Sequence, residues 1–456
     1  MVDEFCHTSR VASALPIDGP PSVKTDLIGG HFRSFRKDPT GFLTKLSGLG
    51  DVTQFRMGPQ QAFFINDPEH IRDLLVVSAD KFIKGRALQR AKTLLGNGLL
   101  TSEGAFHLRQ RRMIQPAFHK NRIEEYARVM VEYGGRLSDT WRDGEIRDID
   151  REMMRLTLQI VAKTLFGADV TDEADEVGRA MTTLVEMFNY LLLPFAELLE
   201  KLPLPQTRRL NRARETLNSI IFQFIDERRR STDDRSDLLS MLLAARDEDD
   251  GGSMTDEQVR DEALTLFLAG HETTANALTW TWYLLSQNPV ITGRLQEELA
   301  KFHDAPQFGD LKDLKYTEAV LAESMRLFPP AWAIGRLSVE EHSFGQFLIP
   351  KGSLVLVSPF VMHRDRRFWR DPEQFRPERW FERSVKEAGQ SFTYFPFSSG
   401  VRRCIGESFA WAEGILLIAT LARKWKLELV PGQKIGLQPM ITLRPKYGMK
   451  MRLMSR

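Results

Sequence analysis

FPFSSGVRRCIG, residues 395–406, contains Cys404, one of two cysteines in a chain of 456 residues. The other, Cys6, lies in the polar start of the chain. Gly400 and Gly406 flank Cys404, and the apolar run that follows it (IGESFAWAEGILLIATLA) has the length and pattern of a buried helix. A cysteine that lies between glycines and directly before a helix indicates a specific chemical role for this loop.

The loop is suited to a metal-bound thiolate. A thiolate at neutral pH needs a stabilising environment, and the N–H groups at a helix N-terminus supply one. Glycines let the backbone approach a flat object closely, and Arg402 offers a fixed positive charge to an anionic group. The sequence has no second cysteine nearby for a zinc site and no histidine close in sequence for a nucleophilic cysteine. A single axial thiolate beside haem therefore fits best, and a loop cysteine without a chemical role is the alternative.

The composition is that of a globular protein with a nearly balanced charge. Hydrophobic residues make up 42% and charged residues 27% of the chain, and 63 Lys and Arg stand against 61 Asp and Glu, a net charge of +2. This balance gives no general argument for nucleic-acid binding. Two cysteines cannot form a disulfide framework, so we expect a reducing compartment, the cytoplasm. Residues 1–20 predict a flexible leader, with neither a signal peptide nor a membrane anchor.

Helical patterns dominate the chain, so we expect a mainly α fold with a minor β region (α+β). Apolar residues recur at three- and four-residue spacing over most of residues 67–330. Residues 51–67 predict a hairpin, and strand patterns return after Pro330. We predict one domain, 21–456, with a small β-rich lobe formed by about 50–66 and parts of 331–358 and 426–456.

A long central helix is predicted in the second half of the chain. Thr255 and Gln258 form a capping-box pattern at its start. Its most apolar part, residues 263–285, is long enough to raise the question of a membrane span. His271 and Glu272 lie in the middle of this part and would be costly in lipid, which favours a helix buried in protein.

Five residues of the cysteine loop carry a family resemblance. Phe397, Gly400, Arg402, Cys404 and Gly406 match the signature F-x-x-G-x-R-x-C-x-G, so the chain resembles the cytochrome P-450 family of haem-thiolate monooxygenases from near its start to its end. The resemblance implies that Cys404 is the axial thiolate ligand of haem b and that Phe397, Arg402 and Gly406 contact the cofactor. It also implies a fold with the haem between the central helix and the helix that follows the cysteine loop.

The segment ESMR is similar to the E-x-x-R helix of that family. Glu323 and Arg326 lie on one helix face, where such ion pairs are common on protein surfaces. FRPERW resembles the family's P-E-R-F segment, with Trp380 in place of the last Phe. The resemblance implies a buried network of Glu323, Arg326 and Arg379 that holds the cysteine loop in place.

AGHETT, in the middle of the central helix, resembles the family's A-G-x-D/E-T-T/S motif for oxygen activation. The small residues Ala269 and Gly270 leave room for a cofactor against the helix. The resemblance implies two catalytic residues: Glu272 helps to relay protons and Thr273 hydrogen-bonds dioxygen. The alternative is a buried polar pair that bends the helix through bonds to its backbone.

Four positions correspond to the family's ligands for the haem propionates. HLRQRR places His107 and Arg111 on one helix face, and His107 stands where many members have Trp. Arg336, in AWAIGR, and Arg402 match the other two positions. Without the resemblance, each arginine would be taken for a surface residue.

The resemblance implies a monooxygenase that inserts one oxygen atom from O2 into a hydrophobic substrate, by C–H hydroxylation or epoxidation. The sequence has no flavin motif, and two cysteines cannot hold an iron–sulfur cluster, so electrons must come from a separate protein. We expect a ferredoxin with its reductase, or a diflavin reductase, and a monomeric oxygenase. The alternatives are a haem-binding gas sensor or carrier and a peroxide-driven haem-thiolate enzyme, and the Glu272–Thr273 pair argues against both.

Two further sets of residues are expected to contact the partner and the substrate. A basic patch on the thiolate side would attract an acidic partner, with ordinary solvated charge as the alternative. Its members are Arg111, Arg112, Arg402, Arg403, Arg423, Lys424 and Lys426. Apolar segments without an evident cationic anchor favour terpenoid or steroid-like substrates over free fatty acids. The expected pocket residues are Phe188, Leu192, Phe195, Trp332, Ile334 and Met440.

Overall fold

The longest described helix, α13 (Asp256–Gln287), begins at the capping box that the sequence predicts. Thr255 Oγ1 accepts a hydrogen bond from the Gln258 N–H at 3.2 Å, and the Gln258 side chain accepts one from the Thr255 N–H at 2.9 Å. The helix ends before Pro289, because a residue that precedes proline disfavours the helical conformation. The computed structural model describes residues 19–24, 29–167, 174–191, 204–230, 237–247 and 251–456.

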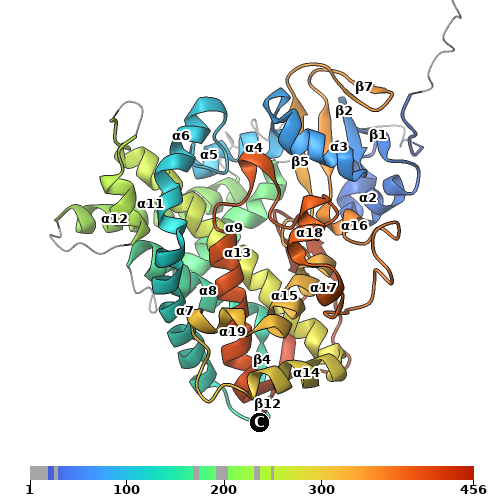
Figure 1. The fold of residues 1–456 in the computed structure, drawn as a ribbon. Helices are drawn as coiled ribbons and strands as arrows, with labels where there is room; N and C mark the ends of the chain where they lie inside the picture. The colour runs from blue at the N-terminus through green and yellow to red at the C-terminus, as the bar shows by residue number, and fades with distance from the viewer. Residues whose placement is uncertain (1–18, 25–28, 168–173, 192–203, 231–236, 248–250) are drawn as a thin grey trace, which may run out of the picture.

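Helices make up most of the described chain, which confirms the mainly α prediction (Figure 1). Besides α13 they are α1 (Phe32–Lys37), α2 (Pro39–Ser47), α3 (Pro68–Arg72), α4 (Arg86–Arg90), α5 (Lys92–Leu95), α6 (Gly104–Ile114), α7 (Lys120–Thr140), α8 (Ile149–Phe166), α9 (Ala174–Leu191), α11 (Pro205–Arg230), α12 (Leu238–Ala244), α14 (Pro289–Leu299), α15 (Lys315–Leu327), α16 (Pro359–Met362), α17 (Arg379–Glu382), α18 (Val385–Gln390) and α19 (Glu407–Lys424).

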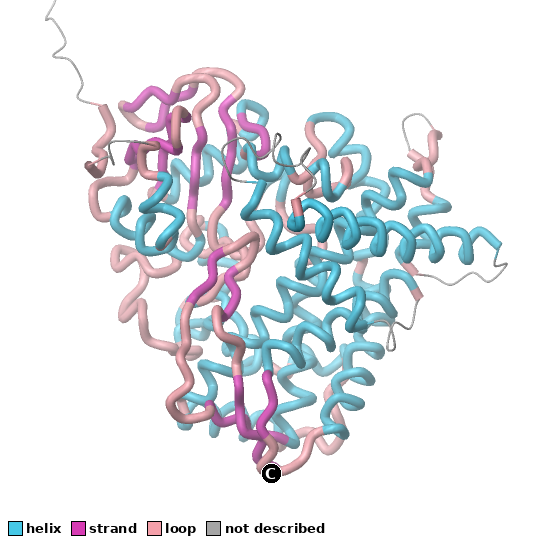
Figure 2. The backbone as a smooth tube through the Cα atoms, turned by 180° about the vertical axis from the view of Figure 1, so that it is seen from behind, coloured by secondary structure: helices cyan, strands magenta, loops and turns pink. Residues whose placement is uncertain are grey.

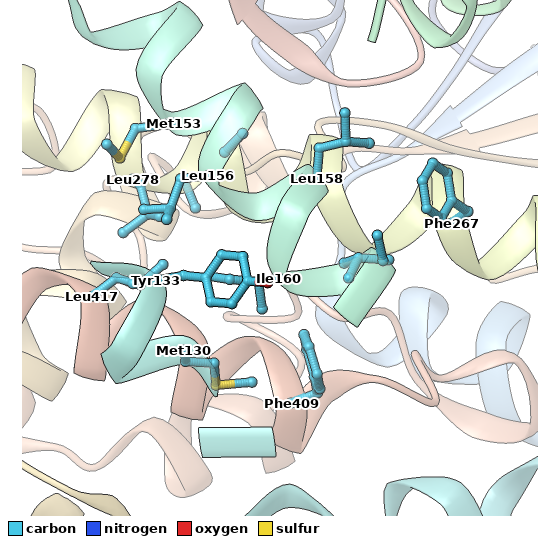
Figure 3. Close-up of a cluster of buried hydrophobic side chains, with 14 of the residues drawn as sticks. Met130, Tyr133, Met153, Leu156, Leu158, Ile160, Phe267, Leu278, Phe409 and Leu417 are labelled. Carbon is cyan, nitrogen blue, oxygen red and sulfur yellow. The ribbon is translucent and has the colours of Figure 1, made fainter. Parts of the chain in front are cut away.

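Four of these helices form the centre of the hydrophobic core. α8 packs along α13, α7 packs along α19, and α13 contacts α19. Apolar side chains from all four meet in one buried cluster, among them Tyr133, Ile160, Leu278 and Leu417 (Figure 3). The helix that follows the cysteine loop is thereby fixed against the central helix, as the sequence predicts.

One five-stranded sheet lies beside this helical core. β2 and β8 pair in parallel, and the other neighbours are antiparallel. β1 and β2 form the hairpin predicted at residues 51–67, with Gly58 in its turn at a φ of 62°. The pairing of β3 with β5 places Lys84 opposite Arg336. The strand order is β1 (Val52–Met57), β2 (Gln60–Ile65), β8 (Leu354–Val357), β5 (Ile334–Ser338) and β3 (Phe82–Lys84).

The C-terminal strands form sheets of their own, although Leu443 packs in one buried cluster with residues of the five-stranded sheet. Met449, Met451 and Leu453 pack in the helical core, so the chain end is held there, away from the five-stranded sheet (Figure 2). The separate sheets consist of β4 (Ile146–Asp148), β12 (Lys450–Ser455) and β9 (Trp425–Leu429), of β10 (Leu437–Pro439) and β11 (Leu443–Pro445), and of β6 (His342–Phe344) and β7 (Phe347–Ile349).

Two expectations about the chain as a whole stay predictions. Residues 1–18 lie outside the described residues, so the flexible leader is not observed, and neither is the extent of the single domain. Within the described ranges, no helix combines the length and the apolar character that a membrane crossing requires.

Candidate active site

Backbone hydrogen bonds shape the cysteine loop. The Cys404 N–H donates to the Phe397 carbonyl at 2.9 Å, and the Arg403 N–H donates to the Gly400 carbonyl at 3.0 Å. Gly400 has a φ of 65°, and a β-carbon there would lie 2.1 Å from the carbonyl oxygen of Leu75. A side chain at this position would therefore be both strained and in collision with the backbone, which explains the glycine of the motif.

The Cys404 thiol lies just before the N-terminus of α19 and has accessible surface. Burial by the surrounding protein raises the pKa of the thiol to about 11, whereas the N–H of Gly406 and the charges of Arg111 and Arg403 lower it. Cys404 as a residue is thus exposed, although protein atoms surround its thiol. These surroundings alone do not hold a thiolate at neutral pH. A bound metal ion would do so, because coordinating thiols lose their proton outright.

A cluster of buried cations lies near the loop. The side chains of Lys84, Arg336 and Arg402 repel one another, and burial together with this repulsion lowers the pKa of Lys84 to about 7 and that of Arg336 to about 10. Glu103 accepts from the Lys84 N–H and pairs with Arg402. None of the carboxylates in the described ranges forms an ion pair with Lys84 or Arg336.

This excess of buried positive charge fits the two propionates of haem. Buried charges are normally paired, and carboxylates are the natural partners of guanidinium groups. An exposed cysteine and a cationic cluster that Glu103 neutralises only in part are therefore both present for a haem-thiolate cofactor. Cys404 would hold the iron, and Lys84, Arg336 and Arg402 would hold the propionates.

Four propionate ligands were predicted. Arg336 and Arg402 lie in this cluster, whereas Arg111 and His107 contact the cysteine loop. The Arg111 Nη1 donates to the Arg403 carbonyl at 2.8 Å, so it contacts the cysteine loop itself. Lys84 was missed by the sequence analysis, because its position depends on the pairing of two strands about 250 residues apart, which the sequence pattern does not reveal.

His107 also contacts the loop. Its Nε2 lies 3.5 Å from the Val401 carbonyl, and its Nδ1 lies 3.4 Å from Ser102 Oγ. Burial, assisted by the charges of Arg402 and Lys84, lowers the pKa of His107 to about 4. The ring is therefore neutral near pH 7, so any bond to a propionate would come from a neutral N–H.

The AGHETT segment presents one open face of α13. The side chains from Glu262 to Leu268 are buried, whereas Ala269 is exposed, so the face of α13 that carries Ala269 is accessible. The Thr273 hydroxyl donates to the Ala269 carbonyl at 2.7 Å on this face. Gly270 also has a packing role: a β-carbon there would lie 3.0 Å from Val161, so its small size allows α13 and α8 to pack closely.

Glu272 is buried and points to the chain end. Its Oε1 accepts from the Arg444 Nε at 2.8 Å and from the Thr442 hydroxyl. No hydrogen bond joins the side chains of Glu272 and Thr273, both of which the structure describes. The sequence analysis missed Thr442 and Arg444, whose approach depends on the folding of the chain end onto α13.

Glu323, Arg326 and Arg379 form a buried network. The Arg326 Nε and Nη2 each lie 2.9 Å from a Glu323 oxygen, and the Arg379 Nε lies 2.9 Å from Glu323 Oε1. Trp380, which replaces the phenylalanine of the family pattern, donates from Nε1 to Glu323 Oε2 at 3.1 Å, a bond that phenylalanine cannot make.

The structure describes only some of the predicted pocket residues. Leu192 and Phe195 lie outside the described residues, and Phe188 is in α9 without a described side chain. Trp332 is buried in a cluster with residues of α2, and its Nε1 donates to the Met440 carbonyl at 2.9 Å. Ile334 and Met440 are half-buried.

Comparisons with known proteins agree with this site. A family model described as cytochrome P450 matches residues 20–451. A cyclooctatin synthase of Streptomyces melanosporofaciens is 39% identical over 420 residues, 91% of each chain. A cyclooctat-9-en-7-ol 5-monooxygenase of the same organism is 36% identical over 407 residues, 88% of each chain. A pentalenene oxygenase of Streptomyces avermitilis is 34% identical over 433 residues, 94% of this chain and 95% of the relative.

The family model covers almost the whole chain, and the cysteine loop has a thiol and a cationic cluster that fit haem. This chain therefore belongs to the cytochrome P450 family, the haem-thiolate monooxygenases, which use O2 and electrons from a redox partner.

Proposed function

We propose that this monooxygenase oxidises a terpenoid hydrocarbon or alcohol. The observation that supports this substrate class most directly is the naming of two relatives for their reactions, a cyclooctat-9-en-7-ol 5-monooxygenase and a pentalenene oxygenase. Both names describe oxidation of a largely hydrocarbon molecule. At 34–36% identity, the relatives support the class of substrate and not one compound.

Haem b, when bound through Cys404, would supply the oxidising chemistry, because an axial thiolate favours O–O cleavage. The chain itself would supply the remaining parts of the site. Lys84, Arg336 and Arg402 would neutralise the propionates. The Thr273 hydroxyl, on the open face of α13, would pass a proton into the site, and Glu272 would replenish it.

The substrate would contact two segments from different parts of the chain. Ile334 lies in β5 and Met440 follows β10, and the hydrogen bond from Trp332 to the Met440 carbonyl ties the two segments together. Their exposed surface is apolar, which suits a hydrocarbon substrate. Phe188 stays a predicted contact of the substrate. Trp332 would fix the segments in place and not contact the substrate.

We also propose that an electron-carrying protein, a ferredoxin or a diflavin reductase, docks beside the cysteine loop. The predicted basic patch is partly neutralised: Arg403 pairs with Glu407, and Lys424 pairs with Asp139. Apolar side chains are exposed close to the loop instead. Val76 is 41%, Val77 57%, Leu108 45% and Val401 51% exposed.

Each of these residues lies in the loop, contacts it, or is next in sequence to a residue that contacts it. The Cα of Val76 lies 3.4 Å from the position of a Gly400 β-carbon, and His107, next to Leu108, contacts the Val401 carbonyl. An apolar centre with partly paired cations around it suits a partner that is acidic but not held by charge alone. We expect the rate of electron transfer to fall only moderately as the salt concentration rises. The substitution Val401→Lys should slow electron transfer more than an increase in salt concentration does.

The decisive experiment is to purify the holoenzyme and test terpenoid hydrocarbons, terpenoid alcohols and fatty acids as ligands and substrates. A terpenoid should shift the haem from low to high spin, and with reduced partner and labelled O2 it should give a product that contains one labelled oxygen. Cys404→Ala should lose the red-shifted carbon monoxide band of a haem thiolate. Turnover of fatty acids alone, or turnover that needs only peroxide, would contradict the proposal. Cytoplasmic location and a monomeric state remain parts of the same proposal.

A further inference from the structure

Glu272 is held by a segment that the sequence motifs do not include. Its carboxylate is 1% exposed, and both hydrogen bonds to Oε1 come from the chain end, from the Thr442 hydroxyl and from the Arg444 Nε at 2.8 Å. The Arg444 side chain is 13% exposed. A carboxylate this deeply buried needs a paired cation, and Arg444 supplies it.

The segment that holds Glu272, residues 442–444, is itself fixed to α13 by one contact per helical turn. The Asn276 amide donates to the Thr442 hydroxyl at 3.1 Å, and the Trp280 Nε1 donates to the Leu443 carbonyl at 2.9 Å. Glu272 lies four residues before Asn276, and Trp280 four residues after it, so all three project from one face of the helix. The position of Arg444 is therefore set by three consecutive turns of the central helix.

This face differs from the open face at Ala269. Thr273 follows Glu272 by one residue, about 100° around the helix, and its hydroxyl bonds to the Ala269 carbonyl. The two side chains thus belong to different surroundings: Thr273 faces the open side, and Glu272 faces the chain end. The bonds to Thr442 and Arg444 therefore set how the Glu272 carboxylate is oriented relative to Thr273.

We propose that Arg444 is the positioning residue for Glu272 in oxygen activation, an inference that rests on the oxygenase function proposed above. Arg444 holds the buried carboxylate on the α13 face next to Thr273. Without the guanidinium, Glu272 would keep only the Thr442 hydroxyl, and the carboxylate would lose the partner that fixes its orientation. A displaced carboxylate would no longer relay protons toward Thr273, and electrons would be lost to peroxide.

The same segment links proton supply to the substrate side. Met440, which we place at the substrate, is two residues from Thr442, and the Trp332 indole holds the Met440 carbonyl. The short chain from Met440 to Arg444 thus contacts the substrate region at one end and the proton-supplying carboxylate at the other.

The experiment compares holoenzyme variants Arg444→Gln, Arg444→Lys, Glu272→Gln and the double variant Arg444→Gln/Glu272→Gln. Arg452→Gln is the matched control, because Arg452 is an exposed arginine of the adjacent strand β12 that bonds only a backbone carbonyl, that of Gly144. The first measurement is product and peroxide per NAD(P)H. Arg444→Gln should lower product per NAD(P)H about tenfold, and Glu272→Gln should lower it equally. This is below the typical range for acid–base catalysis because water can substitute for the carboxylate.

The double variant should be no worse than either single one, and Arg444→Lys, which keeps the charge, should recover part of the yield. The second measurement is the folding equilibrium from urea unfolding of the same four variants. The effects of the two single changes on the folding equilibrium constant should be non-additive. The double variant should differ from the product of the two single effects by about tenfold or more, as expected for a charge-assisted hydrogen bond. This second measurement does not depend on turnover and reports on the pair even if a variant is poorly loaded with haem.

The outcomes separate the two proposals. A wild type that oxidises no terpenoid, with non-additive unfolding, would overturn the proposed substrate and leave the Glu272–Arg444 pair standing. Product from the wild type together with unchanged yield in Arg444→Gln would overturn the positioning role, as would additive unfolding. An equal loss of product per NAD(P)H in Arg444→Gln and Arg452→Gln would also overturn it. The loss would then follow from any disturbance of the chain end and not from the bond to Glu272.

Discussion

The backbone N–H of Phe395 donates a hydrogen bond of 2.9 Å to the Nε2 of His363. The carbonyl of the same histidine accepts from Arg326 Nη1 at 2.7 Å. The first residue of the cysteine loop is thus joined through one buried histidine to the network of Glu323 and Arg326. Burial, with the nearby charges of Arg326 and Arg364, holds the pKa of His363 well below its usual range, so the ring stays neutral and can accept this bond.

His363→Leu should therefore destabilise the loop. The variant leaves the Phe395 N–H without its acceptor in a buried place, a change that costs about 1–3 kcal/mol in the free energy of unfolding. His363→Gln, whose amide oxygen can accept a hydrogen bond, should recover part of this loss. Urea unfolding measures the stability, and the carbon monoxide spectrum measures the integrity of the loop. Equal stability of both variants and the wild type would show that the bond does not hold the loop.

Trp380→Phe should lower stability although it restores the residue of the family pattern. The change removes the bond from Nε1 to the Glu323 carboxylate, and a hydrogen bond to a charged group contributes about 1.5–3 kcal/mol. Trp369→Phe is the matched control, because Trp369 is a similarly buried neighbour whose Nε1 has no partner among the described atoms. Chemical denaturation of the two variants should show a larger loss for Trp380. A larger loss of stability in Trp369→Phe than in Trp380→Phe would show that the loss reflects ring packing and not the hydrogen bond.

The sequence predicted the local features of this fold well. Capping by Thr255 and Gln258, the hairpin at 51–67 and the helix after Cys404 all depend on residues close together in the chain. Such features follow from hydrogen bonding and apolar spacing within one segment, which the sequence displays directly. The grouping of strands far apart in sequence into one β-rich lobe stays a prediction. Strand patterns reveal that a strand exists and not which sheet it joins.

The candidate site shows the same division. The motif residues Cys404 and Thr273 could be named from the sequence because their spacing is fixed by the family pattern. Lys84 and Arg444 could not, because each reaches the site through the pairing or packing of distant segments. Gly270 was assigned to the open face, whereas its contact with Val161 depends on the crossing of two helices. A single sequence contains no direct sign of such contacts.

Lys84→Met should weaken the retention of haem. Lys84 is 8% exposed and has no carboxylate partner in the described chain, and its pKa of about 7 follows from burial and the neighbouring cations. A haem propionate would pair with it, so its loss should speed haem transfer to an acceptor protein by about tenfold or more. Lys81→Met is the control, because Lys81 is an exposed lysine paired with Glu340. Equal transfer rates for the two variants would remove Lys84 from the propionate site.

Glu413→Gln should flatten the dependence of stability on pH. Glu413 lies in α19, is fully buried, and burial raises its pKa to about 8 although the Thr274 hydroxyl acts in the opposite direction. Between its ordinary pKa and about 8 the folded state binds more protons than the unfolded state. The free energy of unfolding therefore falls as pH rises through this window, by up to about 1.4 kcal/mol per pH unit.

The measurement is the free energy of unfolding at about pH 5 and about pH 8, for the wild type and Glu413→Gln. The variant should lose less stability between the two values. Some slope should remain, because burial also raises the pKa of Glu262 to about 8. An identical slope in both proteins would mean that Glu413 is not held neutral in the folded state.

Thr273→Ala should separate electron consumption from product formation. The change removes one hydroxyl that bonds only the Ala269 carbonyl, so folding, haem content and substrate binding should be nearly unchanged. Without this hydroxyl on the open face of α13, protons reach the site through water alone. NAD(P)H should still be consumed, peroxide should rise, and product per NAD(P)H should fall by about tenfold to a hundredfold, at or below the lower limit of the typical range for acid–base catalysis.

The controls for this prediction lie in the same helix. Thr279 and Thr281 each donate to the carbonyl four residues earlier, at 2.8 and 2.7 Å, as Thr273 does at 2.7 Å, but both are buried away from the open face. Thr279→Ala and Thr281→Ala remove the same backbone bond and should leave product per NAD(P)H at the wild-type value. If all three variants lose yield alike, the hydroxyl of Thr273 acts only through helix geometry. If none does, the proton path into the site does not pass through Thr273.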